Sequence, residues 1–133
     1  MKNKTTALSI LLIALMAFSL SAEYVPLKVS LTALERVVIG MLIPKEASYT
    51  TWKILNDLRI EIGFNEAELK TLDMKPNPEG EGVIANWGDV PEKEIVFGEV
   101  AEKIIIDALK KLDSESKLPA EYVSVYQKFI ERQ

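Results

Sequence analysis

Residues 83–97 read VIANWGDVPEKEIVF, and this stretch decides the fold class of the chain. Val83–Trp87 and Glu94–Phe97 are short runs rich in β-branched and aromatic residues, which favour β-strands. The residues between the two runs contain a glycine and a proline, so a β-hairpin with a long turn is the simplest prediction. On both sides of this stretch, long segments have helical spacing of their apolar residues. We therefore expect an α+β fold that is mostly helical.

Three helices are predicted before this hairpin. In the first, Thr32 and Glu35 match a capping box, which satisfies backbone amides at the start of a helix. This helix ends before Pro44, because proline disfavours helical geometry in the residue that precedes it. Gly63 is a natural end for the second helix, since glycine tolerates left-handed geometry. The three predicted helices cover residues 32–43, 48 or 50 to 63, and 65–72.

Two more helices are predicted after the hairpin. The first starts at Glu99, and its acids come first and its lysines last, the order that the helix dipole favours. Its apolar residues from Val100 to Leu112 are expected to face inward. Pro119 suits the first turn of the last helix, whose apolar side ends at Ile130. The helices before the hairpin, together with the hairpin, resemble a winged helix, in which the helix before the hairpin reads DNA.

The length of 133 residues leaves room for one domain and not two. We expect residues 31–133 to form a single globular α+β domain. An extended linker over residues 23–30 and an apolar segment over residues 1–22 precede it. Residues 73–82 contain two prolines and two glycines, which predicts a surface loop.

The N-terminal segment has the pattern of a secretory signal peptide. Two lysines precede an uncharged and largely apolar stretch over residues 5–22, and Ser19 and Ser21 place small side chains ahead of a cut before Ala22. Two other interpretations stay open: an uncleaved anchor, because about 17–25 residues span a bilayer, and an apolar helix that packs into the fold. A signal peptide and an uncleaved anchor both place the body of the protein outside the cytoplasmic membrane. We expect an exported protein, periplasmic or extracellular, or one tethered through residues 5–22.

The composition excludes several kinds of chemistry. The chain has no histidine and no cysteine, which excludes disulfides, thiolate zinc sites and catalysis by an imidazole or a thiol. Two of the 16 Lys and Arg lie in the first four residues, so residues 23–133 carry 14 bases against 20 acids, a net charge of −6. A nucleic-acid partner is not expected, because phosphate binding needs clustered cations. We also expect no metal, no cofactor and no small-molecule substrate.

Aromatic residues are the best candidates for a contact surface. Tyr49, Trp52, Trp87 and Phe97 are predicted to lie near the hairpin, and aromatic residues are enriched at the centres of interfaces. The same residues pack well in a core, and that interpretation stays open for most of them. Trp87, beside the predicted hairpin turn, is the one that we expect to be partly exposed.

Four segments resemble a group of small uncharacterised proteins found in phage genomes. They are LIPKE (42–46), WKILNDL (52–58), EIVFGE (94–99) and IIIDALKKLD (104–113). The resemblance covers about residues 31–131 and leaves out the N-terminal segment. It implies an association with phage and assigns no activity to any residue.

The apolar start and the missing catalytic residue types favour a small non-enzymatic protein of phage or bacterial origin. We expect it to be exported or membrane-tethered and to act by contact with another protein. One alternative is a cytoplasmic winged-helix-like regulator that binds nucleic acid and packs its apolar N-terminus into the fold. Another is a small hydrolase that uses loop carboxylates such as Glu92 and Glu94.

Overall fold

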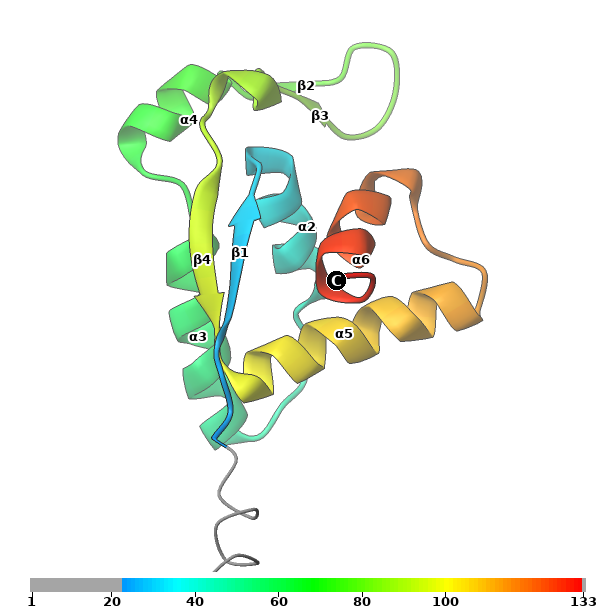
Figure 1. Cartoon of the computed structure of the whole chain (residues 1–133). Coiled ribbons are helices and arrows are strands. Elements are labelled where there is room, and N and C mark those ends of the chain that lie inside the picture. The colour runs from blue at the N-terminus through cyan, green and yellow to red at the C-terminus, as the bar shows by residue number, and fades with distance from the viewer. Residues whose placement is uncertain (1–22, 133) are drawn as a thin grey trace, which may run out of the picture.

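The computed structural model describes residues 23–132, and within this range five α-helices and two small antiparallel sheets form the fold (Figure 1). The predicted class, α+β and mostly helical, is confirmed. Residues 1–22, on which the predicted signal peptide or anchor falls, lie outside the described part. The helices are α2 (Ala33–Leu42), α3 (Tyr49–Ile62), α4 (Glu66–Leu72), α5 (Glu99–Ser114) and α6 (Val123–Phe129). The strands are β1 (Leu27–Leu31), β2 (Lys75–Pro76), β3 (Val83–Ile84) and β4 (Lys93–Phe97), and 3₁₀ turns lie at η1 (Trp87–Asp89) and η2 (Ala120–Tyr122).

The strands pair differently from the prediction. β4 pairs with β1 in an antiparallel register that places Val29 opposite Ile95, and β3 pairs with β2. The predicted hairpin between residues 83–87 and 94–97 is therefore wrong. β1 and β4 share one alternation of buried and exposed residues, so their pairing joins two apolar faces. The residues of β3 are exposed and offer no such face.

β1 also moves the boundary of the domain. Residues 23–30 were expected to form a linker, but Leu27–Leu31 form a strand whose Val29 and Leu31 side chains are buried. In the same way, part of the predicted loop over residues 73–82 forms β2. Both corrections have one cause, because a short strand is stabilised by its partner strand and not by its own residues alone. The partner of β1, β4, also lies far from it in the sequence.

The main core lies between the inner face of the β1–β4 sheet and the helices α2, α3, α5 and α6. Phe97 of β4 and Phe129 of α6 pack edge to face, with ring centroids 4.9 Å apart and an interplanar angle of 85°. A second, smaller cluster of Ala33, Leu72 and Val90 holds α4 against the start of α2. In Figure 1, α4 and the β2–β3 hairpin accordingly lie at the end of the molecule opposite the start of β1.

Substitution of Phe97 tests its place in the core. Phe97→Ala is expected to lower the free energy of unfolding by about 3–5 kcal/mol, because it leaves a cavity beside Phe129. Val96→Thr is the control on the same strand: Val96 is 52% exposed, and the change is expected to stay within about 0.5 kcal/mol. Urea unfolding followed by tryptophan fluorescence measures both. Equal losses in the two variants would contradict the placement of Phe97.

Candidate interaction surface

The four aromatic residues predicted to form a contact surface do not come together. Tyr49 begins α3 and is 77% exposed, whereas Trp52 is half-buried against the main core with the Arg59 guanidinium 5.0 Å from its ring centroid. Trp87 packs on the smaller cluster, and Phe97 is fully buried in the main core. Phe97 therefore offers no surface to a partner, and its prediction as a contact residue is corrected. The expected grouping depended on a hairpin that does not form.

Trp87 lies at the α4 end of the domain. Its half-buried side chain packs against the cluster of Ala33, Leu72 and Val90 and lines a hollow with Pro91. The partial exposure agrees with the expectation, although Trp87 stands in the 3₁₀ turn η1 and not in a hairpin turn. This position is distinct from that of Tyr49, which begins α3 at the other end of the molecule (Figure 1).

A groove of about 540 Å³ lies between α5 and the connection from α2 to α3, and we name it the α5 groove. Pro44 and Ala47 line one side, and Val100 and Ile104 line the other. Because Val100 and Ile104 are four residues apart, they share one face of α5. Val100 was predicted to face inward, but it is 43% exposed at the groove. The groove thus has apolar walls that water reaches.

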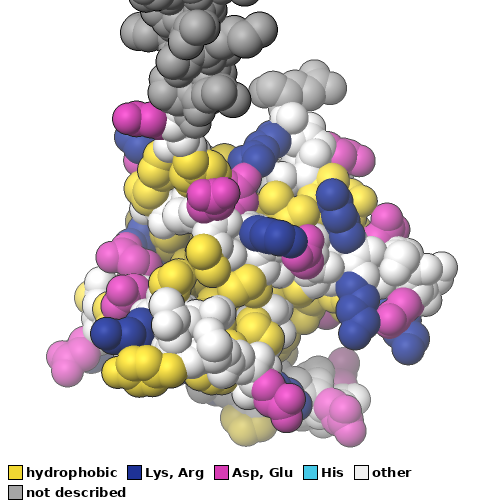
Figure 2. Space-filling view, turned by 90° about the horizontal axis from the view of Figure 1, so that it is seen from below, with side chains coloured by type: hydrophobic (Ala, Val, Ile, Leu, Met, Phe, Trp, Pro, Cys, Tyr) yellow, Lys and Arg dark blue, Asp and Glu magenta, His cyan; other side chains and the backbone are white. Residues whose placement is uncertain are grey.

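Charged side chains surround these apolar walls. Glu46 and Glu99 line the groove, and Lys103 and Asp107 form an ion pair along α5 with 2.6 Å between Nζ and Oδ2. Figure 2 views the molecule from the end at which β1, α3 and α5 begin, and it shows hydrophobic side chains gathered between basic and acidic ones. An apolar centre with a polar rim is the usual composition of a protein interface.

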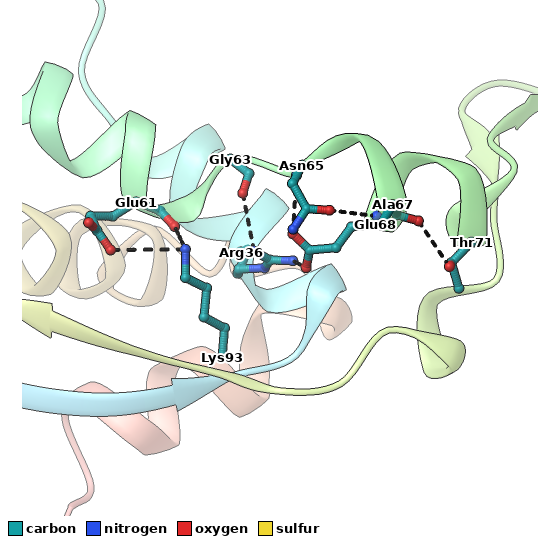
Figure 3. Close-up of polar contacts among 8 residues, drawn as sticks. All are labelled: Arg36, Glu61, Gly63, Asn65, Ala67, Glu68, Thr71 and Lys93. Atoms are coloured by element: carbon teal, nitrogen blue, oxygen red, sulfur yellow. Dashed lines mark hydrogen bonds and ion pairs between the residues drawn. The ribbon is translucent and has the colours of Figure 1, made fainter.

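A buried arginine ties α2 to the corner between α3 and α4 (Figure 3). The Arg36 side chain is fully buried, donates to the Gly63 carbonyl at 3.2 Å and forms an ion pair with Glu68. Its guanidinium also lies 4.3 Å from the centroid of the Phe64 ring. Glu68 is held in place because its other oxygen accepts from the backbone N–H of Asn65, in the capping box of α4. These contacts fix α4 against α2.

Tyr24 and Arg132 join both ends of the described chain to α5. The Tyr24 hydroxyl donates to one oxygen of Glu102, and Arg132 donates to the other. Burial raises the pKa of Glu102, but these hydrogen bonds lower it by more, so the net pKa lies below its usual value. The hydrogen bond to Glu102 raises the pKa of Tyr24 to about 12, with burial as the next cause. Tyr24 therefore donates this bond at all physiological pH values.

Comparison with known proteins finds no matching family model, no matching curated protein and no matching solved structure. Over residues 23–132, no three acidic side chains are grouped so that they could hold a metal ion. None of the helices in that range combines the length and the apolar character that a membrane span requires. A functional assignment therefore depends on the surface chemistry of the chain itself.

The ion pair of Arg36 predicts a pH dependence of stability. Burial raises the pKa of Glu68, but hydrogen bonds from Arg36 and the Asn65 backbone lower it by more, so its net pKa lies below 4.5. A lowered carboxyl pKa stabilises the fold above the unfolded-state value near 4.5, and this stabilisation is lost as the pH falls through the folded-state value. Glu68→Gln is therefore expected to cost about 1–3 kcal/mol at pH 7 and less near pH 3.

Urea unfolding at both pH values measures this difference. Glu66→Gln is the matched control, because Glu66 lies in the same first turn of α4 and is exposed. It is expected to change stability by less than about 0.5 kcal/mol at either pH. A cost of Glu68→Gln that stays constant as the pH falls would contradict the proposed role of its charge.

Proposed function

We propose that this is a small non-enzymatic protein that binds another protein through the α5 groove and is exported or tethered to the cytoplasmic membrane. The observation that supports this proposal best is the groove itself, with the apolar side chains Ala47, Val100 and Ile104 in its walls. Tyr49, which is 77% exposed, directly follows Ser48 of the lining. Exposed apolar and aromatic side chains beside a hollow are typical of contact surfaces.

The groove suits binding in which apolar contact supplies the affinity. Removing the side chains of Val100 and Tyr49 from water contributes roughly 25 cal/mol for each Å² of apolar surface that is buried. Both side chains of the Lys103–Asp107 ion pair on the rim are well exposed, so this ion pair adds little to the affinity for a partner. Rim charges of this kind select and orient a partner more than they tighten the complex.

The place of action rests on the N-terminal segment. A basic start followed by the uncharged stretch over residues 5–22 supports export, or tethering where the segment is retained. The net charge of −6 over residues 23–133 supports a protein partner in preference to an anionic surface. The association with phage is part of the same proposal and rests on the segments of residues 31–131 quoted above.

The nucleic-acid alternative has one feature in its favour. A hairpin, β2–β3, follows α4 directly, as the wing of a winged helix follows its reading helix. The loop of this hairpin carries Glu79 and Glu81 and no basic residue, and the first turn of α4 carries Glu66 and Glu68. In a complex with nucleic acid these carboxylates would lie against phosphates and be repelled by them. We therefore favour a protein as the partner of α4 and the β2–β3 hairpin.

Site-specific photo-crosslinking of the full chain in its native host tests the proposed function. A benzophenone amino acid at Val100 is expected to give one adduct of defined mass, and Ala47→Lys in the opposite wall is expected to abolish it. Val123 is the matched control, because it is also 43% exposed but lies on α6 outside the groove. Adducts of equal yield at both positions, or a chain found only in the cytosol, would contradict the proposal.

A gel-shift assay at low salt tests the alternative. We expect no retardation of double-stranded DNA by the full chain, because the acidic side chains of α4 and of the β2–β3 loop repel phosphates. A basic winged-helix protein is the positive control. Sequence-selective retardation would overturn the preference for a protein partner.

A further inference from the structure

A second groove, of about 500 Å³, runs along β1, and we name it the β1 groove. Four consecutive strand residues, Leu27 to Ser30, form one side of it, and Lys128 and Arg132 line the other. β1 pairs only with β4 within the described residues, so the edge of β1 away from β4 borders this groove. The α5 groove has none of these lining residues.

Backbone groups of Lys28 and Ser30 point to this free edge. The Ser30 carbonyl accepts from Lys128 Nζ at 2.8 Å, so it points away from β4. In an antiparallel strand the N–H and C=O of one residue point to the same edge, and every second residue shares that edge. The N–H of Ser30 and both groups of Lys28 therefore face the groove. Outside the β1–β4 ladder, no segment of residues 23–132 forms a backbone-to-backbone hydrogen bond with Lys28 or Ser30.

Three cations line the β1 groove. Lys28 is exposed and forms no ion pair within residues 23–132. Lys128 and Arg132 each pair with one carboxylate, yet their side chains remain 33% and 42% exposed. Glu92 is the one acidic residue of the described lining, and it accepts a hydrogen bond of 3.0 Å from the Ser30 hydroxyl. Lys28 is thus the cation of this groove that lacks a carboxylate partner within the described residues, in a chain that is acidic as a whole.

We propose that the β1 groove binds an extended acidic segment of another protein, which adds to the β1–β4 sheet as a third strand. The N–H of Ser30 and both backbone groups of Lys28 would bond to the backbone of that segment and set its register, while the Ser30 carbonyl stays bonded to Lys128. Its carboxylates would lie on one face of the added strand and meet Lys28 on the outer face of the sheet. Its alternate, apolar side chains would lie on the side of α6, against the aliphatic stems of Lys128 and Arg132. A second copy of this chain fits less well, because pairing β1 with β1 brings the same cations together.

A synthetic hexapeptide of alternating Glu and Val, labelled with fluorescein, is the probe. It is titrated with the full chain in mild detergent and followed by fluorescence anisotropy. The Glu-Val peptide is expected to bind, with an apparent Kd that rises with salt concentration. A Lys-Val peptide of equal length is expected not to bind, and neither is a Glu-Val peptide whose backbone amides are N-methylated, because it cannot donate to β1.

Proline substitutions at the two edges of the sheet separate strand addition from general charge attraction. Ser30→Pro removes an N–H that faces the groove, and proline is tolerated on such an edge. It is expected to weaken peptide binding about tenfold, which corresponds to about 1.4 kcal/mol. Glu94→Pro is the matched control, because Glu94 lies opposite Ser30 and its N–H faces the other edge of the sheet. Peptide binding to this control is expected to stay unchanged.

A charge reversal supplies a second variant that leaves the backbone intact. Lys28→Glu is expected to weaken binding of the Glu-Val peptide and to improve binding of the Lys-Val peptide. Circular dichroism shows whether Ser30→Pro folds. If it does not fold, Lys28→Glu is the variant that tests whether the peptide binds in the β1 groove. Val100→Lys, in the α5 groove, is expected to leave peptide binding unchanged. The α5 groove and the β1 groove are thus tested by separate variants, and a failure of the proposed function can be distinguished from a failure of this proposal.

Four outcomes would overturn the proposal. The first is no binding of the Glu-Val peptide, and the second is binding that N-methylation leaves unchanged. The third is an equal loss in Ser30→Pro and Glu94→Pro. The fourth is self-association of the full chain that Ser30→Pro abolishes, which would assign the edge to a second copy.

Discussion

The antiparallel pairing of β1 with β4 is the interaction on which the rest of the fold depends. It joins residues 27–31 to residues 93–97 and brings their two apolar faces into one surface, on which α5 and α6 pack. The register places Phe97 inward against Phe129 and therefore Val96 outward. Within the described part of the chain this sheet has two strands, so one edge of β1 has no strand partner there. Core, groove and exposed residues all follow from this one alignment, because a slip of one residue would exchange the two faces.

The helices could be predicted from the sequence because their ends depend on residues at most four positions apart. Thr32 and Glu35 form the predicted capping box, and Asn65 and Glu68 form the same motif at the start of the helix predicted over residues 65–72. Strand partners could not be predicted in this way. The runs around Val83 and around Ile95 were each favourable for a strand. The run around Ile95 pairs with residues 27–31, far away in the sequence, because both have a buried face, whereas Val83 pairs with Pro76 across a short loop. Pairing these two runs with each other was the simplest choice and was wrong.

The candidate surface was predictable only in part, for the same physical reason. Aromatic character marks a residue as fit for a core or for an interface, and the register of its element decides which. Tyr49 is exposed because its side chain in α3 faces solvent, and Phe97 is buried because it faces inward on β4. Arg36 was not singled out, although a charged residue among the apolar positions of α2 is a usable signal. Its partner Glu68 lies in another helix, and no local pattern names it.

Two adjacent charged residues of α2 each bind an element far away in the sequence, and one of these contacts borders the β1 groove. Arg36 holds the corner of α3 and α4, while Glu35 accepts from Lys128 of α6 at 3.0 Å. Lys128 at the same time donates to the Ser30 carbonyl of β1. Glu35 and Arg36 are both buried, so the loss of either ion-pair partner would leave a buried charge without compensation. This cost disfavours alternative packings of these elements. The β1 groove is therefore bounded on one side by a lysine that is already fixed at two points. A strand added there would meet an edge whose geometry is set before binding, which lowers the entropy that association costs.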